Sequence, residues 1–262
     1  MDTAQKFMKI QAINNMQRLV HFGVGVLQSN VTQRPFKLTF VCTYRCNSRC
    51  QLCSIWQKPI KPELTLTEIE HFFQKNSYFT WIDLTGGEIT LRPDITKIIS
   101  IIFKYSPQLY FFHFATNCRH PKLVQRVIEH AMKLHPPKFA ITLSLDGDEA
   151  LHDTLRGVKG NWRRVMETYA LLQPLMRDGL EVVFGVTVSA ANVDHLRHII
   201  QAAREEFPHL GWKDFHFNIA HHSSHYYGNT SKVASSTPVA QKTIKALREF
   251  DADRPLFWWL SP

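Results

Sequence analysis

Three cysteines lie close together in the sequence, at Cys46, Cys50 and Cys53. Cysteine thiolates bind zinc and iron–sulfur clusters, and three of them on one loop can converge on a single metal centre. A cubane iron–sulfur cluster usually takes four cysteines, and no fourth cysteine lies near this segment. The spacing therefore favours a cluster in which one iron keeps an open position for a small-molecule ligand.

Structural zinc is the alternative for this segment, with a histidine as the fourth ligand. Zinc sites usually pair two Cys-x-x-Cys knuckles, however, and the second knuckle is missing here. The other two cysteines, Cys42 and Cys118, stand apart, and we expect them to pack at strand ends. So few and so unevenly placed cysteines do not suit a disulfide framework, which indicates a reducing compartment.

From about residue 37 the chain alternates between short runs rich in β-branched and aromatic residues and longer runs with helical spacing. The expected strands are residues 37–42, 80–85, 109–115, 139–145, 181–188 and 214–219. The expected helices are residues 65–75, 94–105, 121–134, 162–172, a helix capped by Asn192, and 238–250. Six strand–helix units predict an α/β fold with a parallel sheet, a partial (β/α)6 TIM-like barrel open at one side.

Local signals mark where two of these helices begin. Thr65 and Glu68 have the spacing of a capping box, and Asn192 is a candidate N-cap. In the complete eight-unit barrel, the chemistry lies on loops after the carboxyl ends of the strands. By analogy, we expect functional residues at that edge of this sheet.

Small and polar residues do follow the expected strand ends. They are Gly86, Gly87 and Glu88 after the second strand, Thr116 and Asn117 after the third, Ser144 and Asp146 after the fourth, Arg156 ten residues beyond Asp146, and Val188 at the end of the fifth. Glycines let a backbone approach a ligand closely, and a carboxylate can accept a hydrogen bond from an ammonium group. Taken singly, most of these residues are also ordinary turn formers.

The C-x3-C-x2-C spacing after a first strand, followed by these motifs in this order, resembles the radical S-adenosylmethionine (SAM) superfamily. The resemblance runs from Phe36 to about Ala220. It implies an enzyme in which Cys46, Cys50 and Cys53 hold a [4Fe–4S] cluster, while the amino and carboxylate groups of SAM chelate the fourth iron. Reductive cleavage of SAM would then give a 5′-deoxyadenosyl radical that modifies a substrate.

The resemblance also implies cofactor-binding roles for the glycine motif and for the residues after the third strand. Gly86, Gly87 and Glu88 look like the family's motif that holds the methionine amino group of SAM. Thr116 and Asn117 occupy a position that contacts SAM in similar enzymes.

Further along, the Ser-Leu-Asp-Gly…His-Asp-x-x-Arg-Gly run resembles the branch that includes molybdenum-cofactor cyclases and peptide maturases. Ser144 and Asp146 are then expected to bond the ribose hydroxyls, and Arg156 to pair with the SAM carboxylate through its planar guanidinium. Val188, at the end of the fifth strand, is expected beside the adenine.

Two features depart from the family pattern. The residue before the last cysteine of the motif is usually aromatic, and here it is Leu52, with Trp56 close by in sequence. No cysteine follows Cys118, so we expect no auxiliary cluster in this chain.

Histidines at positions 221, 222 and 225 follow the sixth strand. They are candidates for substrate contact, acid–base work or a metal site, although a solvated loop is the more common explanation for such residues.

The net charge of the chain indicates which kinds of partner it favours. The chain has 31 Lys+Arg against 22 Asp+Glu, a formal net charge of +9. This excess favours acidic partners, such as an electron donor of the flavodoxin or ferredoxin kind, an anionic or lipid-linked substrate, or an anionic membrane surface. A peptide is the alternative substrate. No basic run or recognisable motif supports nucleic acid. A non-catalytic metal-binding module is the rival from another class.

The expected organisation has three parts. Residues 1–36 form an amphipathic helical extension, residues 37–250 the barrel, and residues 251–262 a short apolar tail. We expect the extension to pack on the open side or the bottom of the barrel, with contact at a membrane interface as the alternative. The chain has neither a run of ~20 apolar residues nor a secretory signal, which predicts a cytoplasmic protein, membrane-associated in the second case.

Overall fold

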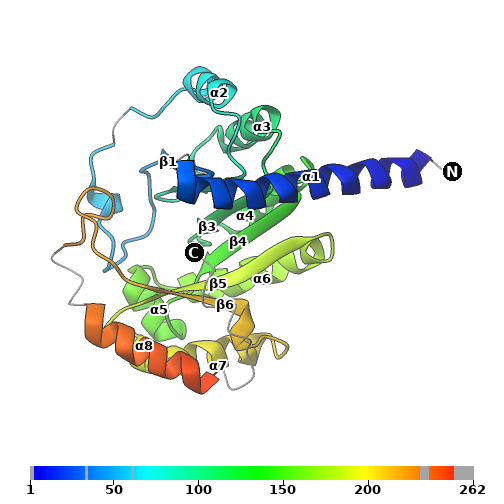
Figure 1. The fold of residues 1–262 in the computed structure, drawn as a ribbon. Coiled ribbons are helices and arrows are strands. Elements are labelled where there is room, and N and C mark those ends of the chain that lie inside the picture. Colours follow the sequence, from blue (N-terminus) through cyan, green and yellow to red (C-terminus); the bar gives the residue numbers. More distant parts are fainter. Residues whose placement is uncertain (1–2, 33–34, 61, 231–235, 251–262) are drawn as a thin grey trace.

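The computed structural model describes residues 3–32, 35–60, 62–230 and 236–250, and strands and helices alternate along them (Figure 1). The expected tail at 251–262 lies outside the described residues. The strands are β1 (Lys37–Thr43), β2 (Trp81–Gly86), β3 (Phe111–Thr116), β4 (Lys138–Ser144), β5 (Leu180–Val188) and β6 (Phe215–Ile219). The helices are α1 (Thr3–Thr32), α2 (Leu66–Lys75), α3 (Ile95–Tyr105), α4 (Pro121–Met132), α5 (Glu149–Arg156), α6 (Asn161–Met176), α7 (Leu196–Glu206) and α8 (Ser236–Phe250).

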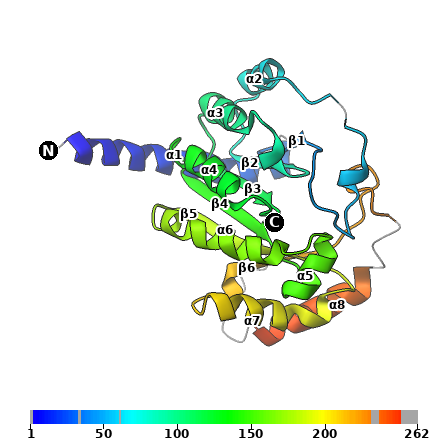
Figure 2. The same ribbon diagram turned by 180° about the vertical axis from the view of Figure 1, so that it is seen from behind.

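The six strands form one sheet in the order β1-β2-β3-β4-β5-β6, and every neighbouring pair is parallel. This confirms the predicted partial (β/α)6 barrel. β1 and β6 are the two ends of the sheet and do not pair with each other, so the barrel is open between them. Figure 2 shows α4 and α6 side by side over the outer face of the sheet.

The apolar core lies between the sheet and these helices, because successive side chains of a strand point to opposite faces. On β2, Ile82 and Leu84 are buried toward the helices, whereas Asp83 is only partly buried on the inner face. On the central strand β3, Phe114 is fully buried but Ala115 is exposed. The inner face of the half-barrel is therefore open to solvent.

Helix α1 packs at the amino ends of the first strands, the bottom of the barrel. The ring of Phe22 lies 6.0 Å from that of Phe36, 6.3 Å from Trp81 and 5.4 Å from Tyr110, measured between centroids. Gly25 faces Phe36, whose Cβ would lie 3.1 Å from an added Cβ. Gly25 has no side chain to hold the helix away from Phe36, so α1 can approach the barrel bottom.

The structure also contains a helix that the sequence analysis missed, α5, in the connection after β4. Asp148 caps it, accepting a hydrogen bond from the N–H of Leu151 at 3.0 Å, and Gly157 ends it with φ of 62°. With only 8 residues, α5 is too short for hydrophobic periodicity to reveal it. The capping box of Thr65 and Glu68 at the start of α2 is confirmed.

No helix among the described residues is long and apolar enough to cross a membrane.

The aromatic contact at the barrel bottom can be tested by replacing Phe22 with alanine. We expect Phe22→Ala to lower the free energy of unfolding by about 1–3 kcal/mol, since the ring leaves a partly buried gap against Trp81 and Tyr110. The matched control is Leu27→Ala on the same helix, where the side chain is 70% exposed and the change should stay within about 0.5 kcal/mol. Equal effects in urea unfolding would show that α1 does not stabilise the barrel.

Candidate functional site

The cysteine loop follows β1 and is held by the last turn of α5. The backbone N–H groups of Arg49 and Gln51 donate to the carbonyl oxygens of Arg156 and Leu155 at 3.0 and 2.9 Å. Gly157 continues this contact, because an added Cβ would lie 2.5 Å from the carbonyl oxygen of Arg49. The helix that sequence reasoning missed therefore fixes the path of the loop between the cysteines.

On its other side, the loop begins against the glycine turn at the end of β2. The N–H groups of Gly87 and Glu88 donate to the carbonyl oxygens of Thr43 and Arg45 at 2.9 and 2.8 Å. A Cβ on Gly86 would lie 2.0 Å from the Thr43 oxygen, and one on Gly87 would lie 2.2 Å from the Arg45 oxygen. Only glycine leaves room for this approach.

The three thiols of the loop are partly buried, and burial raises the pKa of Cys46 to about 11, with the charges of Cys50 and Cys53 adding to the effect. Among the described residues, no group of three or more His, Cys, Asp or Glu side chains could hold a metal ion. A zinc site needs its ligands at about 2.3 Å from one point. A cubane cluster spreads its cysteines over different irons, so three thiols spaced along one loop that is held on both sides fit the ligand set of such a cluster.

Glu88 joins the ends of β2 and β3. Its side chain is 1% exposed and accepts hydrogen bonds from the hydroxyl of Thr90 at 2.7 Å, the hydroxyl of Thr116 at 3.0 Å and the N–H of Asn117 at 2.7 Å. Burial raises the pKa of this carboxyl group. Much of its accepting capacity is used by protein donors, so Glu88 serves first as a bridge between the two loops.

Asn117 extends this bridge to the cysteine loop. Its amide Nδ2 donates to Asn47 Oδ1 at 2.8 Å and to Ser48 Oγ at 3.0 Å, and its carbonyl oxygen accepts from Asn161 Nδ2 at 3.1 Å. The loops after β1, β2 and β3 are thus joined, and Ser48, Glu88 and Asn117 in this bridge are buried.

Two buried residues that the sequence analysis did not single out, His152 and Asn161, support this network. His152 Nδ1 accepts from the N–H of Asp146 at 3.1 Å, and His152 Nε2 lies 2.8 Å from Asn161 Nδ2. Both side chains are fully buried, and burial lowers the pKa of His152 well below its ordinary value, so the ring is neutral. His152 stands in the motif that ends at Arg156, and this was the signal that could have found it.

Asp146 and Arg156 form a buried ion pair, with 2.7 Å between Oδ2 and Nε. The other carboxylate oxygen accepts from the N–H of Thr187 at 2.8 Å. Burial opposes the charge of Arg156, but Asp146 and the thiol of Cys50 outweigh it and raise the pKa of the guanidinium further. The guanidinium therefore lies beside a cysteine of the motif, and its pairing with the carboxylate of SAM stays a prediction.

Asn192 stands at the N-cap position of a short 3-10 helix, Val193–His195, that leads into α7, but its side chain makes no capping hydrogen bond, contrary to the sequence prediction. Its Oδ1 accepts from the N–H of Ser189 at 2.8 Å, and its Nδ2 donates to the carbonyl oxygens of Asp146 at 2.9 Å and Thr187 at 3.0 Å. It is fully buried and ties the loop after β5 to the loop after β4. Sequence alone could not show this, because one partner, Asp146, comes from the loop after β4.

The remaining predicted residues lie at the same edge of the sheet. Ser144 ends β4 opposite Gly185 in register, and Val188 ends β5. The side chain of Val188 is fully buried and its carbonyl oxygen accepts from the N–H of Ala220 at 2.7 Å. All the predicted cofactor-binding residues therefore gather at the carboxyl ends of β2 to β5 or at the end of α5.

The cysteines outside the loop and the histidines after β6 differ in their exposure to solvent. Cys42 and Cys118 are buried in the core, as predicted. The histidines at 221, 222 and 225 have exposed side chains.

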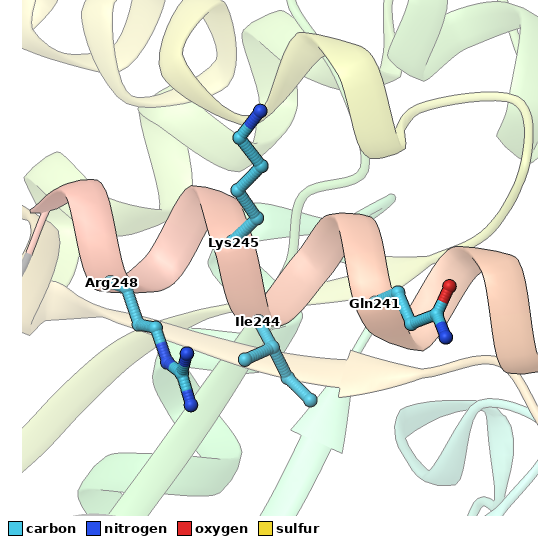
Figure 3. A pocket seen from close by; sticks show the side chains of 4 residues that line it. All are labelled: Gln241, Ile244, Lys245 and Arg248. Atoms are coloured by element: carbon cyan, nitrogen blue, oxygen red, sulfur yellow. The ribbon is translucent and has the colours of Figure 1, made fainter.

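The pocket of Figure 3 lies along α8 and is lined by Gln241, Ile244, Lys245 and Arg248. None of these four residues belongs to the motifs at the strand ends, so this pocket is not the site.

The family model described as the radical SAM superfamily matches residues 40–217, a span that contains all the motifs above. The chain belongs to the radical SAM superfamily. Curated relatives are the subtilosin biosynthesis protein AlbA of Bacillus subtilis, 27% identical over 215 residues (79% of this chain, 44% of AlbA), and the GTP 3′,8-cyclase of Sulfurimonas denitrificans, 28% identical over 128 residues (44% of this chain, 40% of the cyclase). The chain spans less than half the length of these relatives.

Two solved structures share the fold of this superfamily member. SuiB of Streptococcus suis with bound SAM has a TM-score of 0.59, 13% identity and coverage of 87% of this chain and 52% of SuiB. The enzyme anSMEcpe with bound SAM and a peptide has a TM-score of 0.62, 16% identity and coverage of 83% and 60%.

The contact between the glycine turn and the cysteine loop predicts the effect of a single methyl group. Gly87→Ala should push Arg45 and Cys46 away and destabilise the protein by about 1–3 kcal/mol. The iron bound after anaerobic reconstitution should also fall severalfold. In the control Gly211→Ala, the nearest neighbour of an added Cβ would be Asp214 Oδ2 at 3.9 Å, so iron binding should not change. Full iron loading in Gly87→Ala would contradict the geometry.

Proposed function

We propose that this chain is the catalytic barrel of a radical SAM enzyme. The observation that carries the proposal is the cysteine loop, which is held between the glycine turn of Gly86 and Gly87 and the end of α5. Family membership supplies the expected chemistry. When bound, the [4Fe–4S] cluster and SAM supply a 5′-deoxyadenosyl radical that attacks the substrate.

In this proposal the protein binds and orients its cofactors. Cys46, Cys50 and Cys53 hold the cluster. The turn of Gly86 and Gly87 approaches the methionine end of SAM with its backbone, while Glu88 keeps that turn joined to the next loop, where Thr116 and Asn117 lie.

The ribose and adenine of SAM are assigned to the next two strand ends. Ser144 and Asp146 face the ribose, and the backbone around Val188 borders the adenine, since the Val188 side chain is buried. Arg156 stays charged beside Asp146 and supplies positive charge at the edge of the cysteine loop.

An external electron donor is part of the proposal. The net charge of +9 suits an acidic carrier such as flavodoxin or ferredoxin, because opposite charges speed association. The free cysteines suit the reducing cytoplasm, where we place the protein.

For the substrate, a peptide has the better support. Two curated relatives carry names of peptide maturation, the subtilosin biosynthesis protein AlbA and the sporulation killing factor maturation protein SkfB. An anionic or lipid-linked small molecule rests on the net charge and on the apolar residues of the N-terminal helix.

The proposed chemistry is tested by anaerobic reconstitution with iron and sulfide, followed by incubation with SAM and dithionite. We expect 5′-deoxyadenosine by mass spectrometry, with its formation abolished in Cys50→Ala because the cluster loses a ligand. The matched control is Cys42→Ala, which removes a buried thiol outside the loop and should retain activity. A wild-type protein that takes up only zinc would exclude the proposed function and leave the metal-binding module.

Peripheral membrane contact through α1 has one supporting observation. Along this helix, Ile13, Met16, Val20, Leu27 and Val31 are each more than half exposed. Their spacing of three, four and seven residues places them on one side of the helix. The helix sequence contains lysine and arginine but no acidic residue, which suits an anionic surface.

This contact predicts binding to vesicles of anionic phosphatidylglycerol in co-sedimentation, and much weaker binding to neutral phosphatidylcholine. Leu27→Glu should reduce the bound fraction severalfold, because it places a carboxylate on the apolar side of α1. Ile60→Glu, at a 68% exposed position away from the helix, is the matched control and should bind like the wild type. Equal binding of both variants would refute the role of α1.

A further inference from the structure

The segment after β6, residues 221–229, bridges the open side of the barrel, and we call it the clasp. Its Tyr227 carbonyl oxygen accepts from the N–H of Ser54 at 2.8 Å, and its Asn229 Nδ2 donates to the Leu52 carbonyl oxygen at 3.1 Å. Figure 1 shows this orange segment beside the short helical turn after the cysteine loop. The clasp thus connects the first and last strand–helix units at the top of the sheet, where β1 and β6 do not pair.

Hydrogen bonds within the clasp hold its backbone in place, although its histidines are exposed to solvent. Asn229 is 3% exposed, and its Oδ1 accepts from the N–H of Ser223 at 2.9 Å. Its Nδ2 also donates to the carbonyl oxygen of His221 at 3.1 Å. Gly228 turns the chain with φ of 60° and donates its N–H to the Ser223 carbonyl oxygen at 2.7 Å. This order gives Tyr226 a fixed place.

The hydroxyl of Tyr226 reaches the glycine turn. It donates to the carbonyl oxygen of Gly86 at 3.1 Å and lies 2.9 Å from the hydroxyl of Thr85. Its ring packs edge-on against Tyr44, which precedes the cysteine loop, with 6.4 Å between centroids.

The contacts with the end of β1 use the N–H groups of Gly87 and Glu88, whereas the carbonyl oxygen of Gly86 accepts a hydrogen bond from Tyr226. The carbonyl oxygens of Thr43 and Arg45 accept these two hydrogen bonds, which fixes the turn from one side. Tyr226 fixes it from the other. We propose that Tyr226 is a positioning residue that holds the glycine turn in the orientation that binds SAM, and that the clasp thereby couples the SAM site to the cysteine loop. This inference rests on the proposed function.

The test measures SAM affinity and cluster content separately in the reconstituted protein. Tyr226→Phe keeps the ring and loses the hydroxyl. Its dissociation constant for SAM should rise about 3- to 10-fold, the loss that one neutral hydrogen bond usually brings. Its bound iron should equal that of the wild type. The change that SAM causes in the electron paramagnetic resonance spectrum of the reduced cluster should require correspondingly more SAM.

Two further variants separate positioning from a structural role. Tyr227→Phe is the matched control, because it keeps the ring contacts with His221 and Tyr226 and the backbone contact with Ser54, and its SAM affinity should stay within about twofold of the wild type. Thr85→Val leaves Tyr226 in place but removes its second partner, and it should weaken SAM binding in the same direction.

The outcomes are distinct. Unchanged SAM affinity in Tyr226→Phe, or an equal loss in Tyr227→Phe, would overturn the inference while the proposed function stands. Iron loading that falls in parallel with SAM binding would make Tyr226 a structural residue only and would also overturn it. A wild-type protein without cluster or SAM binding would overturn the proposed function, and the inference with it.

Discussion

The close backbone contact between the ends of β1 and β2 is the constraint on which the site depends. Two N–H groups of the glycine turn meet two carbonyl oxygens of the chain that leads into the cysteine loop, at 2.9 and 2.8 Å. No side chain takes part, so the position of the loop is set by the strand ends themselves, and these are set by the sheet register that pairs Val41 with Thr85. Rotating one strand end would therefore move the cysteines and the turn together.

Around this contact, buried polar groups fix the other loops at the same edge. Glu88, Asn117, Asn161 and Asn192 each join segments from different strand–helix units. Leaving a buried polar group without a partner costs about 1–3 kcal/mol, so displacing one loop penalises its neighbours as well. The result is a rigid edge in which thiols and backbone groups are arranged before any cofactor arrives, as precise chemistry requires.

Sequence alone located this edge but not its cross-links. The order of strands and helices follows from hydrophobic spacing, and motif residues such as Glu88 could be placed because they stand directly after strands. The role of Asn192 was predicted wrongly because an asparagine before a helical run usually caps it. Here its amide instead donates to the carbonyl oxygen of Asp146 in the loop after β4. The helix α5 was missed because its 8 residues hold too few periods, and its contacts with the cysteine loop are tertiary.

Six strands cannot close a barrel of this kind, and the open side has a consequence for the substrate. The inner face carries a polar chain: Asp83 Oδ1 lies 3.2 Å from His113 Nδ1, and His113 Nε2 lies 2.8 Å from the hydroxyl of Thr142. Gly185 makes room for Thr142, since a Cβ there would lie 2.3 Å from its methyl group. With α1 across the bottom and the clasp at the top, the open side is where a substrate can meet this wall. Because these groups already pair with one another, covering the wall with a substrate does not leave them without partners, and the cost of burying an unpaired polar group is avoided.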